Sequence, residues 1–507
     1  MPTSSLALST RIKELNSIGV ALSAEKNEAK LLELILTSAR NLTGADAGTL
    51  YKVNAKEECL EFEIVHNDQL NIYLGGSGEP ISANFNPVPL YLTCSNERMP
   101  NERMPNERMI VAWSVLHKKT VRLADAYNEA GFDFSGTKAF DAKTGYRSKS
   151  FLTVPLLNHE GEVIAALQLL NKTCPNSKET LEFNAEDQDI AESLASQAAI
   201  ALTNRCLIEE LRNLFDSFTR VIASAIDSKS PHTGAHCRRV PEITLLLAEA
   251  ANGLDFPGLE GFSLTDDDRY EIKTAAWLHD CGKIVTPHHV MEKSTKLEGL
   301  FDRLGWVEDK FELAIKDVQL AKLEAEVAAA KAGKSLSQTE LTHFTQQEAA
   351  LKEDLAFVQG ANTGSEFMRD EDLARIENLA ATTWRTHTGE IKPLLTSEEV
   401  ANLSIRRGTL NAEERQIMED HMLHTISMLK QLPFPKNLQR VPEYAVGDHE
   451  RMDGKGYPLG LTKEQLSIPA RIMALADVFE ALTAHERPYK KPMPVSMALN
   501  IMGRMAA

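Results

Sequence analysis

Two ionisable residues stand side by side at the end of an apolar run of sequence. His279 and Asp280 follow residues 275–278 and precede Gly282 and Lys283. Burying a histidine and an aspartate costs free energy unless something pairs with them. A divalent metal ion is a natural partner, because neutral imidazole and carboxylate are nitrogen and oxygen ligands that suit iron, manganese or zinc. The alternative is an ordinary helix end, with a solvated aspartate and a histidine satisfied in the core.

Other residues with ligand chemistry are concentrated in the second half of the chain, where eleven of the fourteen histidines lie between residues 232 and 485. His232 and His236 are four residues apart, so they share one face if this segment is helical. Asp477 lies within the apolar helical run 468–483, where a carboxylate needs a strong partner such as a metal ion. Any metal-dependent chemistry therefore belongs to the second half.

A glycine-rich stretch, Asp-Gly-Lys-Gly-Tyr-Pro at residues 453–458, follows Asp448 and His449. Its composition predicts a turn. Glycines there let the backbone approach a ligand closely, and Tyr457 adds a ring face and a hydroxyl. This turn is therefore a candidate for contact with a substrate.

Together these motifs resemble the HD-GYP family, a branch of the HD-domain metal-dependent phosphohydrolases, over residues 210–507 apart from an insertion. The match comprises, in the family order, His-Asp followed by Gly-Lys, a distant histidine, the His-Glu-Arg stretch with Asp-Gly-Lys-Gly-Tyr-Pro, and Ala-Asp-Val-Phe with Arg-Pro-Tyr at 487–489. The resemblance implies a first metal ion, held by His236, His279, Asp280 and Asp477. It also implies a second ion, bound by Asp280 as the bridging ligand and by His421, Asp448 and His449. His232 falls where some members place a carboxylate for a third ion.

The resemblance also implies the reaction, which is hydrolysis of cyclic di-GMP to linear pGpG or on to GMP. In a two-metal site the ions, here iron or manganese, activate water and stabilise the phosphoryl oxygens, and Asp280 as the bridge fits this need. Lys283 would neutralise charge on the phosphate, unless it is a surface lysine. The residues expected to bind the rest of the substrate are Arg451, Lys455, Gly456, Tyr457 and Pro458. Two rival hypotheses are a phosphodiesterase for another cyclic dinucleotide, such as cyclic GMP-AMP, and a catalytically inactive receptor for cyclic di-GMP.

Two features depart from the family pattern. Asp448 stands where the family usually has a histidine, so we expect a more oxygen-rich site with an altered metal preference. The chain also stops at Ala507, where a further C-terminal helix is expected. This indicates a truncated C-terminus.

The first half of the chain resembles a GAF domain over residues 25–205. The resemblance rests on residues 143–156 and on Gln-Leu-Leu-Asn-Lys at 168–172. Cyclic-nucleotide-binding members of that family carry a motif that is matched here by Asn171, Lys172, Phe183 and Asp187, whereas Gln188 replaces the final glutamate. The resemblance implies a regulatory pocket for cAMP or cGMP. The alternative is a GAF fold that only dimerises.

The order of elements predicts an α+β domain, an antiparallel sheet flanked by helices, followed by an all-α HD-domain bundle. We expect an N-terminal helix (1–24), the GAF-like domain (25–205), a connecting helix (190–226) and the phosphodiesterase domain (210–507). The connecting helix contains neither proline nor glycine. It either pairs with a second copy, giving a homodimer through the GAF domain and this helix, or serves as a rigid spacer. Residues 300–395 predict an inserted helical hairpin, whose second helix starts with a capping box at 337–340.

Bulk composition indicates a globular protein of several domains, because 507 residues exceed a single core. The formal net charge of −17 disfavours binding to nucleic acid polymers or anionic membranes. No apolar run approaches the roughly 20 residues that a membrane helix needs. The six cysteines form no CxxC pair. We therefore expect a cytoplasmic protein with free thiols.

Overall fold

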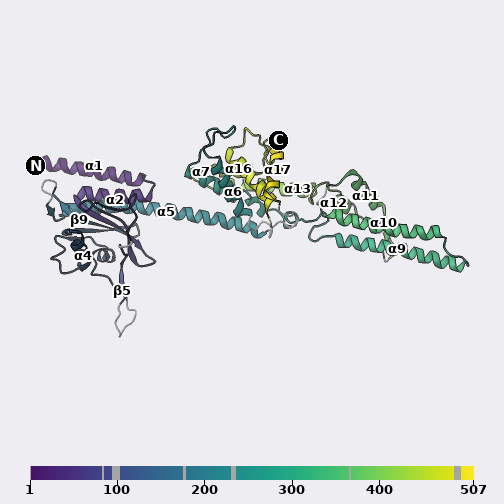
Figure 1. The fold of residues 1–507 in the computed structure, drawn as a ribbon, viewed down its shortest axis with the longest axis horizontal. Helices are drawn as coiled ribbons and strands as arrows, with labels where there is room; N and C mark the ends of the chain where they lie inside the picture. Colours follow the sequence, from purple (N-terminus) through teal and green to yellow (C-terminus); the bar gives the residue numbers. More distant parts are fainter. Residues whose placement is uncertain are drawn as a thin grey trace, which may run out of the picture. The chain divides into compact units, whose positions relative to one another are not determined.

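A computed structural model describes residues 2–82, 85–93, 103–174, 179–229, 236–364, 367–386, 388–484 and 493–506 (Figure 1). The chain divides into two compact units, Met1–Asn213 and Leu214–Ala507. Among the helices of the described ranges, none is both long and apolar enough to cross a membrane.

The first unit is built on one antiparallel sheet with the strand order β3-β2-β1-β9-β8-β7, in which β4 also pairs with β2 and β10 with β9. The strands of this sheet are β1 (Ala45–Asn54), β2 (Cys59–Asn67), β3 (Ile72–Gly75), β4 (Val88–Pro89), β7 (Val121–Leu123), β8 (Phe151–Leu157), β9 (Val163–Thr173) and β10 (Thr180–Leu181). A separate pair consists of β5 (Tyr91–Thr93) and β6 (Arg103–Pro105). The register pairs the central strands β1 and β9 from Ala45 opposite Lys172 to Lys52 opposite Ala165.

Helices cover both faces of this sheet. One face packs against α1 (Pro2–Ala24), α2 (Glu28–Thr43) and the first part of α5 (Ala185–Lys229), and Leu50 of β1 is buried there. The next residue, Tyr51, belongs to a second buried cluster with Val111 of α3 (Ile110–His117), while α4 (Ser135–Thr144) follows further along the chain. Neighbouring residues of a strand point to opposite faces, so each face of the sheet has its own core. The predicted α+β class is confirmed.

The second unit is helical. Its helices outside the insertion are α6 (His236–Ala251), α7 (Asp266–Leu278), α8 (His288–Met291), α13 (Ala412–Glu419), α14 (His421–Gln431), α15 (Val441–Val446), α16 (Ile468–Thr483) and α17 (Val495–Ala506), and its short 3₁₀ turns are η1 (Cys281–Ile284), η2 (Lys436–Leu438) and η3 (Gly447–His449). Ala248, Ile272, Tyr444 and Met473 bring α6, α7, α15 and α16 into one buried cluster. The predicted helical bundle is confirmed.

The insertion forms a small domain with a core of its own. A helical hairpin, α9 (Leu304–Lys331) and α10 (Gln338–Asn362), is followed by α11 (Asp370–Ala381), the strand pair β11 (Thr383–Arg385) and β12 (Ile391–Pro393), and α12 (Ser397–Leu403). The two hairpin helices lie side by side (Figure 1), with Phe311 and Val358 in the same cluster. Ser337 and Glu340 form the capping box expected at the start of α10. The insertion thus contains more than the expected hairpin.

Candidate metal centre

The potential metal ligands come from the ends of several helices of the second unit. His236 is the first residue of α6, and His421 is the first residue of α14. His279 is the C-cap residue directly after α7 and is followed by Asp280. Asp448 and His449 lie in η3, and Asp477 lies in α16. Ligand atoms of His236, His279 and Asp477 lie within 4.8 Å of one another, and the same limit holds for Asp280, His421 and His449, and for Asp448, His449 and Asp477. The structure therefore brings all seven side chains together.

Asp280 lies between two groups of histidines. Its Oδ2 is 3.3 Å from Nε2 of His236 and 3.2 Å from Nε2 of His279. Its Oδ1 is 3.5 Å from Nε2 of His421. The two oxygens of one carboxylate thus face different sides of the centre, which is the arrangement that a bridging ligand requires.

The histidine rings are held in one orientation by the nitrogen that faces away from Asp280. Nδ1 of His279 lies 2.8 Å from the carbonyl oxygen of Ala276, and Nδ1 of His421 lies 2.5 Å from that of Met418. When Nδ1 donates its proton to these carbonyls, the inward Nε2 carries a free lone pair. The backbone at the two helix ends therefore aims two imidazoles at the centre.

Inside the centre many buried polar atoms lack a hydrogen-bond partner. Among the described residues they include Nε2 of His236, His279, His421 and His449, Oδ1 of Asp280 and both carboxylate oxygens of Asp448. An unpaired buried polar atom costs about 1–3 kcal/mol, so a cluster of seven requires a partner. Divalent cations supply one, since all these atoms are metal-ligand types. The residues present fit a metal centre.

Burial and mutual contacts determine the charges of these groups. Burial alone would lower the pKa values of His279 and His236, but the carboxylates around them, Asp280 above all, raise them to about 10 and about 8. Burial, with repulsion from Asp477, raises the pKa of Asp448 well above its usual range. The pKa of Asp280 is lowered in spite of burial, because Lys283 and His279 lie beside it. The protein alone therefore holds protons where cations would bind.

Lys283 contacts the central carboxylate directly. Its Nζ lies 2.6 Å from Oδ2 of Asp280, and its side chain is 20% exposed. Burial opposes the charge of this ammonium group, but Asp280 and Asp477 raise its pKa. Lys283 is therefore a positive charge at the edge of the centre and not a surface lysine.

Of the residues expected to bind substrate, Tyr457 is the one that adjoins the centre. Its ring stacks on the ring of His449, with centroids 5.0 Å apart and planes at 12°. Gly456 leaves no room for a side chain, because an added Cβ would overlap the backbone nitrogen of Arg451. The side chain of Arg451 pairs with Asp453 at 3.1 Å, and Lys455 is exposed. Pro458 follows Tyr457 in the same turn and is partly buried.

One residue of the centre has no counterpart among the sequence predictions. Glu480 is 1% exposed, and its Oε2 lies 2.5 Å from Nδ1 of His236. Its Oε1 accepts two hydrogen bonds from the guanidinium of Arg239, at 2.9 and 2.6 Å. Glu480 therefore orients His236 as backbone carbonyls orient His279 and His421. The available signal was its position, three residues after Asp477 and so on the same side of α16.

Some predicted residues lie outside the described ranges. His232, expected near a third ion, is one of them, and so are Arg487 and Tyr489 of the family motif.

The four residues predicted to bind an effector occupy structural positions in the first unit. Nζ of Lys172 lies 2.5 Å from Oδ2 of Asp187, and Phe183 is buried in the core between sheet and helices. The amide of Asn171 accepts a hydrogen bond from the backbone N–H of Lys149 at 2.8 Å. These contacts join β9 to its surroundings.

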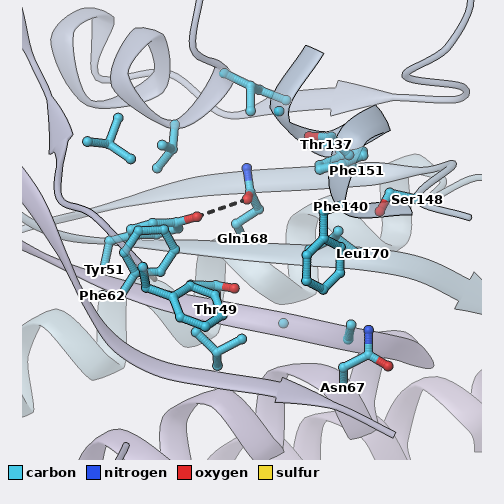
Figure 2. A pocket seen from close by; sticks show the side chains of 18 of the residues that line it. Thr49, Tyr51, Phe62, Asn67, Thr137, Phe140, Ser148, Phe151, Gln168 and Leu170 are labelled. Atoms are coloured by element: carbon cyan, nitrogen blue, oxygen red, sulfur yellow. Dashed lines mark hydrogen bonds between the residues drawn. The ribbon is translucent and has the colours of Figure 1, made fainter. Parts of the chain in front are cut away.

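A cavity of about 290 Å³ lies elsewhere in the first unit, on the α3 and α4 side of the sheet. Phenylalanine and tyrosine side chains form part of its walls, and Figure 2 shows Tyr51, Phe62, Phe140 and Phe151 around it. Gln168 also lines it, and the hydroxyl of Tyr51 donates to Oε1 of Gln168 at 3.3 Å (Figure 2). No lysine or arginine is found among the described residues that line it, and none of the four predicted effector residues does so.

Comparison with protein families agrees with the division of the chain into two units. The GAF domain family matches residues 27–202, and two families described as HD domains match residues 233–355 and 395–507. The chain carries a GAF domain and an HD domain. The first HD match runs into the insertion and the second begins at its end, and together they include all seven grouped residues.

Curated relatives of the chain include proteins that are phosphodiesterases by name. The chain is 40% identical over 95 residues to 3′3′-cGAMP-specific phosphodiesterase 3 of Vibrio cholerae, which covers 19% of this chain and 20% of that protein. It is 39% identical over 113 residues to 3′3′-cGAMP-specific phosphodiesterase 1 of the same organism, covering 22% and 25%. It is 39% identical over 94 residues to a cyclic di-GMP phosphodiesterase of Thermotoga maritima, covering 18% and 25%. The chain thus spans a quarter or less of the length of these relatives.

Proposed function

We propose that this protein is a metal-dependent phosphodiesterase that hydrolyses cyclic di-GMP to pGpG, GMP or both. The observation that carries the proposal is the set of unpartnered ligand atoms on both sides of Asp280. The first ion would be held by His236, His279, Asp280 and Asp477, and the second by Asp280, His421, Asp448 and His449. Iron or manganese fits this mixture of imidazoles and carboxylates. Bound divalent ions lower the pKa of water and neutralise charge on a phosphodiester.

The chain's own residues would bind and orient the substrate. Lys283 keeps its proton at neutral pH and would place an ammonium group against a phosphoryl oxygen. Tyr457, already stacked on His449, offers its ring edge and hydroxyl to a guanine base. Arg451 would leave Asp453 to meet the second phosphate, with Lys455, Gly456 and Pro458 shaping the same turn. Asp280 and Lys283 are therefore the residues that we assign to the reaction itself.

A second substrate has support from the comparisons, because two of the relatives described above carry the name of 3′3′-cGAMP. The test incubates the full chain and Asp280→Ala with Mn²⁺ or Fe²⁺ and with each cyclic dinucleotide. We expect linear dinucleotide or mononucleotide from the wild type and none from the variant. Faster turnover of 3′3′-cGAMP would select the second substrate. Binding without any product would identify an inactive receptor and contradict the enzyme.

We further propose that the GAF domain binds cAMP or cGMP as a regulator. The aromatic side chains in the walls of its cavity suit a purine ring, and Asn67 and Gln168 offer amide groups. The phosphate would have to be met by backbone N–H groups in the first turn of α4, where Gly136 and Thr137 line the cavity. Titration of the full chain with both nucleotides tests this. The absence of both binding heat and a change in turnover would contradict it.

We also propose that two copies pair along α5. Six apolar side chains of this helix are each 49–67% exposed: Ile200, Leu207, Leu211, Leu214, Phe218 and Val221. Together with Asn204 they follow one another at alternating intervals of four and three residues, so they share one face. Such spacing is the seam of a two-stranded coiled coil. Asn204 occupies the remaining position of the seam and is exposed. Asparagine at such a position pairs with its own equivalent in an aligned parallel dimer, which favours a second copy as the partner.

A further inference from the structure

The last residue of α5 reaches the turn that follows the central carboxylate. Nζ of Lys229 donates to the carbonyl oxygens of Ile284 and Thr286, both at 2.5 Å, and lies 3.4 Å from that of Lys283. An ammonium group has three protons to donate, and here three carbonyls face it. Carbonyls at the end of a helical turn have no partner within that turn. Lys229 therefore caps η1.

This turn holds the lysine of the metal centre in place. Within it, the backbone N–H of Lys283 donates to the carbonyl of Asp280 at 2.9 Å, and that of Thr286 donates to the carbonyl of Lys283 at 3.1 Å. On one side the turn is anchored to α14, because the N–H of Gly282 donates to Oγ1 of Thr425 at 3.0 Å. Lys229 anchors the other side. The backbone of the turn is thus fixed between α14 and α5.

The end of α5 is itself fixed against the ligands' helices. Ala223 and Ile226 are buried in one cluster with Cys237, which follows the ligand His236, and with Ala275 and Leu278 of α7. The position of Nζ of Lys229 relative to η1 therefore depends on how α5 packs. Any displacement of this end of α5 changes the three carbonyl contacts directly.

We propose that Lys229 is a positioning residue, through which α5 holds the turn 281–286 and keeps Lys283 on Asp280. The kinetic part of this inference rests on the proposed phosphodiesterase activity. Without Lys229 the carbonyls of Ile284 and Thr286 turn to water, the turn loosens, and the ammonium group of Lys283 leaves its 2.6 Å contact with Asp280. Lys229 is the last residue of the long helix α5 (Ala185–Lys229). A displacement of this helix would therefore reach Lys283 through the contacts of Lys229 with the turn.

The test compares Lys229→Met, which keeps the aliphatic stem, with Lys229→Arg, which keeps the donors. Lys430→Met, at an exposed lysine of α14, is the matched control. We expect Lys229→Met to lower kcat for cyclic di-GMP by about tenfold or more, with metal content and KM near the wild type. Lys229→Arg should recover most of the loss, and Lys430→Met should behave as the wild type.

A double variant separates positioning from general destabilisation. If Lys229 acts through Lys283, then Lys229→Met should lower kcat no further in a Lys283→Met background. Amide hydrogen exchange of the metal-free full chain gives a readout independent of activity, because exchange across 281–286 should quicken in Lys229→Met. Unchanged exchange, or additive losses in the double variant, would overturn the inference. A wild type without turnover would contradict the proposed function alone, and exchange would still decide on Lys229.

Discussion

Two buried aspartates of the metal centre hold their protons differently. Asp280 has a lowered pKa because Lys283 and His279 lie beside it, whereas burial and Asp477 raise the pKa of Asp448. In the metal-free protein Asp448 therefore gives up its proton less readily than Asp280 does. In the proposed metal site, Asp448 would supply an oxygen ligand where the resemblance to the HD-GYP family predicts a histidine nitrogen.

Metal binding should therefore release protons and strengthen as pH rises. His279 and His236, with pKa values of about 10 and about 8, are protonated at pH 7, and a protonated imidazole cannot bind a metal. A raised pKa means that metal competes with protons, so affinity is lost as pH falls from 8 to 6. Burial keeps the pKa of His449 at about 4, so this ligand adds nothing to the dependence. Titration of metal-free protein with Mn²⁺ in two buffers of different ionisation enthalpy measures the protons released. Asp448→Asn should release fewer protons than the wild type when Mn²⁺ binds. An affinity for Mn²⁺ that does not depend on pH would contradict this account.

Glu480 provides a test of how His236 is oriented. Glu480→Gln keeps the size of the side chain but removes the charge that Arg239 and His236 share. We expect metal affinity to fall by about tenfold, as for other residues that orient a ligand. Glu443→Gln, at an exposed glutamate of α15, is the control. Equal metal affinity in Glu480→Gln and wild type would show that His236 needs no such partner.

At the scale of elements, the centre depends on how closely η1 approaches α14. Gly282 lies at this crossing, and an added Cβ would overlap the carbonyl oxygen of His421 and the backbone of Thr425. Gly282→Ala should therefore push the two elements apart and lower the free energy of unfolding by about 3 kcal/mol. Urea unfolding measures the free energy of unfolding, and metal titration measures whether η1 and α14 still bring their ligands together. Gly305→Ala in α9, where a Cβ meets nothing within 4 Å, should stabilise by up to about 1 kcal/mol. Similar stability in both variants would contradict the close approach.

Local patterns predicted much of this unit, and long-range contacts explain what they missed. The helical bundle and the candidate ligands His279, Asp280 and Asp477 were visible as apolar helical runs that contain or precede polar residues. The grouping of these ligands around one site was implied by the resemblance to the HD-GYP family. Spacing from Asp477 could place Glu480 on the right side of α16, but its contact with His236 spans 244 residues of sequence, a separation at which no spacing rule operates. The same reason hid Lys229, whose acceptors lie 54 to 57 residues further along the chain.

In the first unit the class of fold was predictable, but the cavity was not. Alternating strand residues such as Leu50 and Tyr51 indicate a sheet covered on both faces, and the structure has both cores. The motif residues Lys172 and Asp187 pair with each other, while the cavity wall joins residues from 47 to 170. A wall assembled from so many segments leaves no local pattern in the sequence. The ligand of this cavity thus stays a prediction.

At the scale of the whole molecule, the exposed seam of α5 predicts that the full chain is a dimer. Leu211→Lys places a charge at its middle, where a partner helix would bury the side chain, and should shift the protein to monomer. Glu209→Lys, on a different face of the same helix and exposed, should leave the dimer intact. Light scattering after gel filtration gives the mass of each. Asn204→Leu should strengthen the association while loosening its alignment, because a polar pair at this position selects one register at a cost in stability. A monomeric wild type, or a dimeric Leu211→Lys, would show that this face of α5 is free of a second copy.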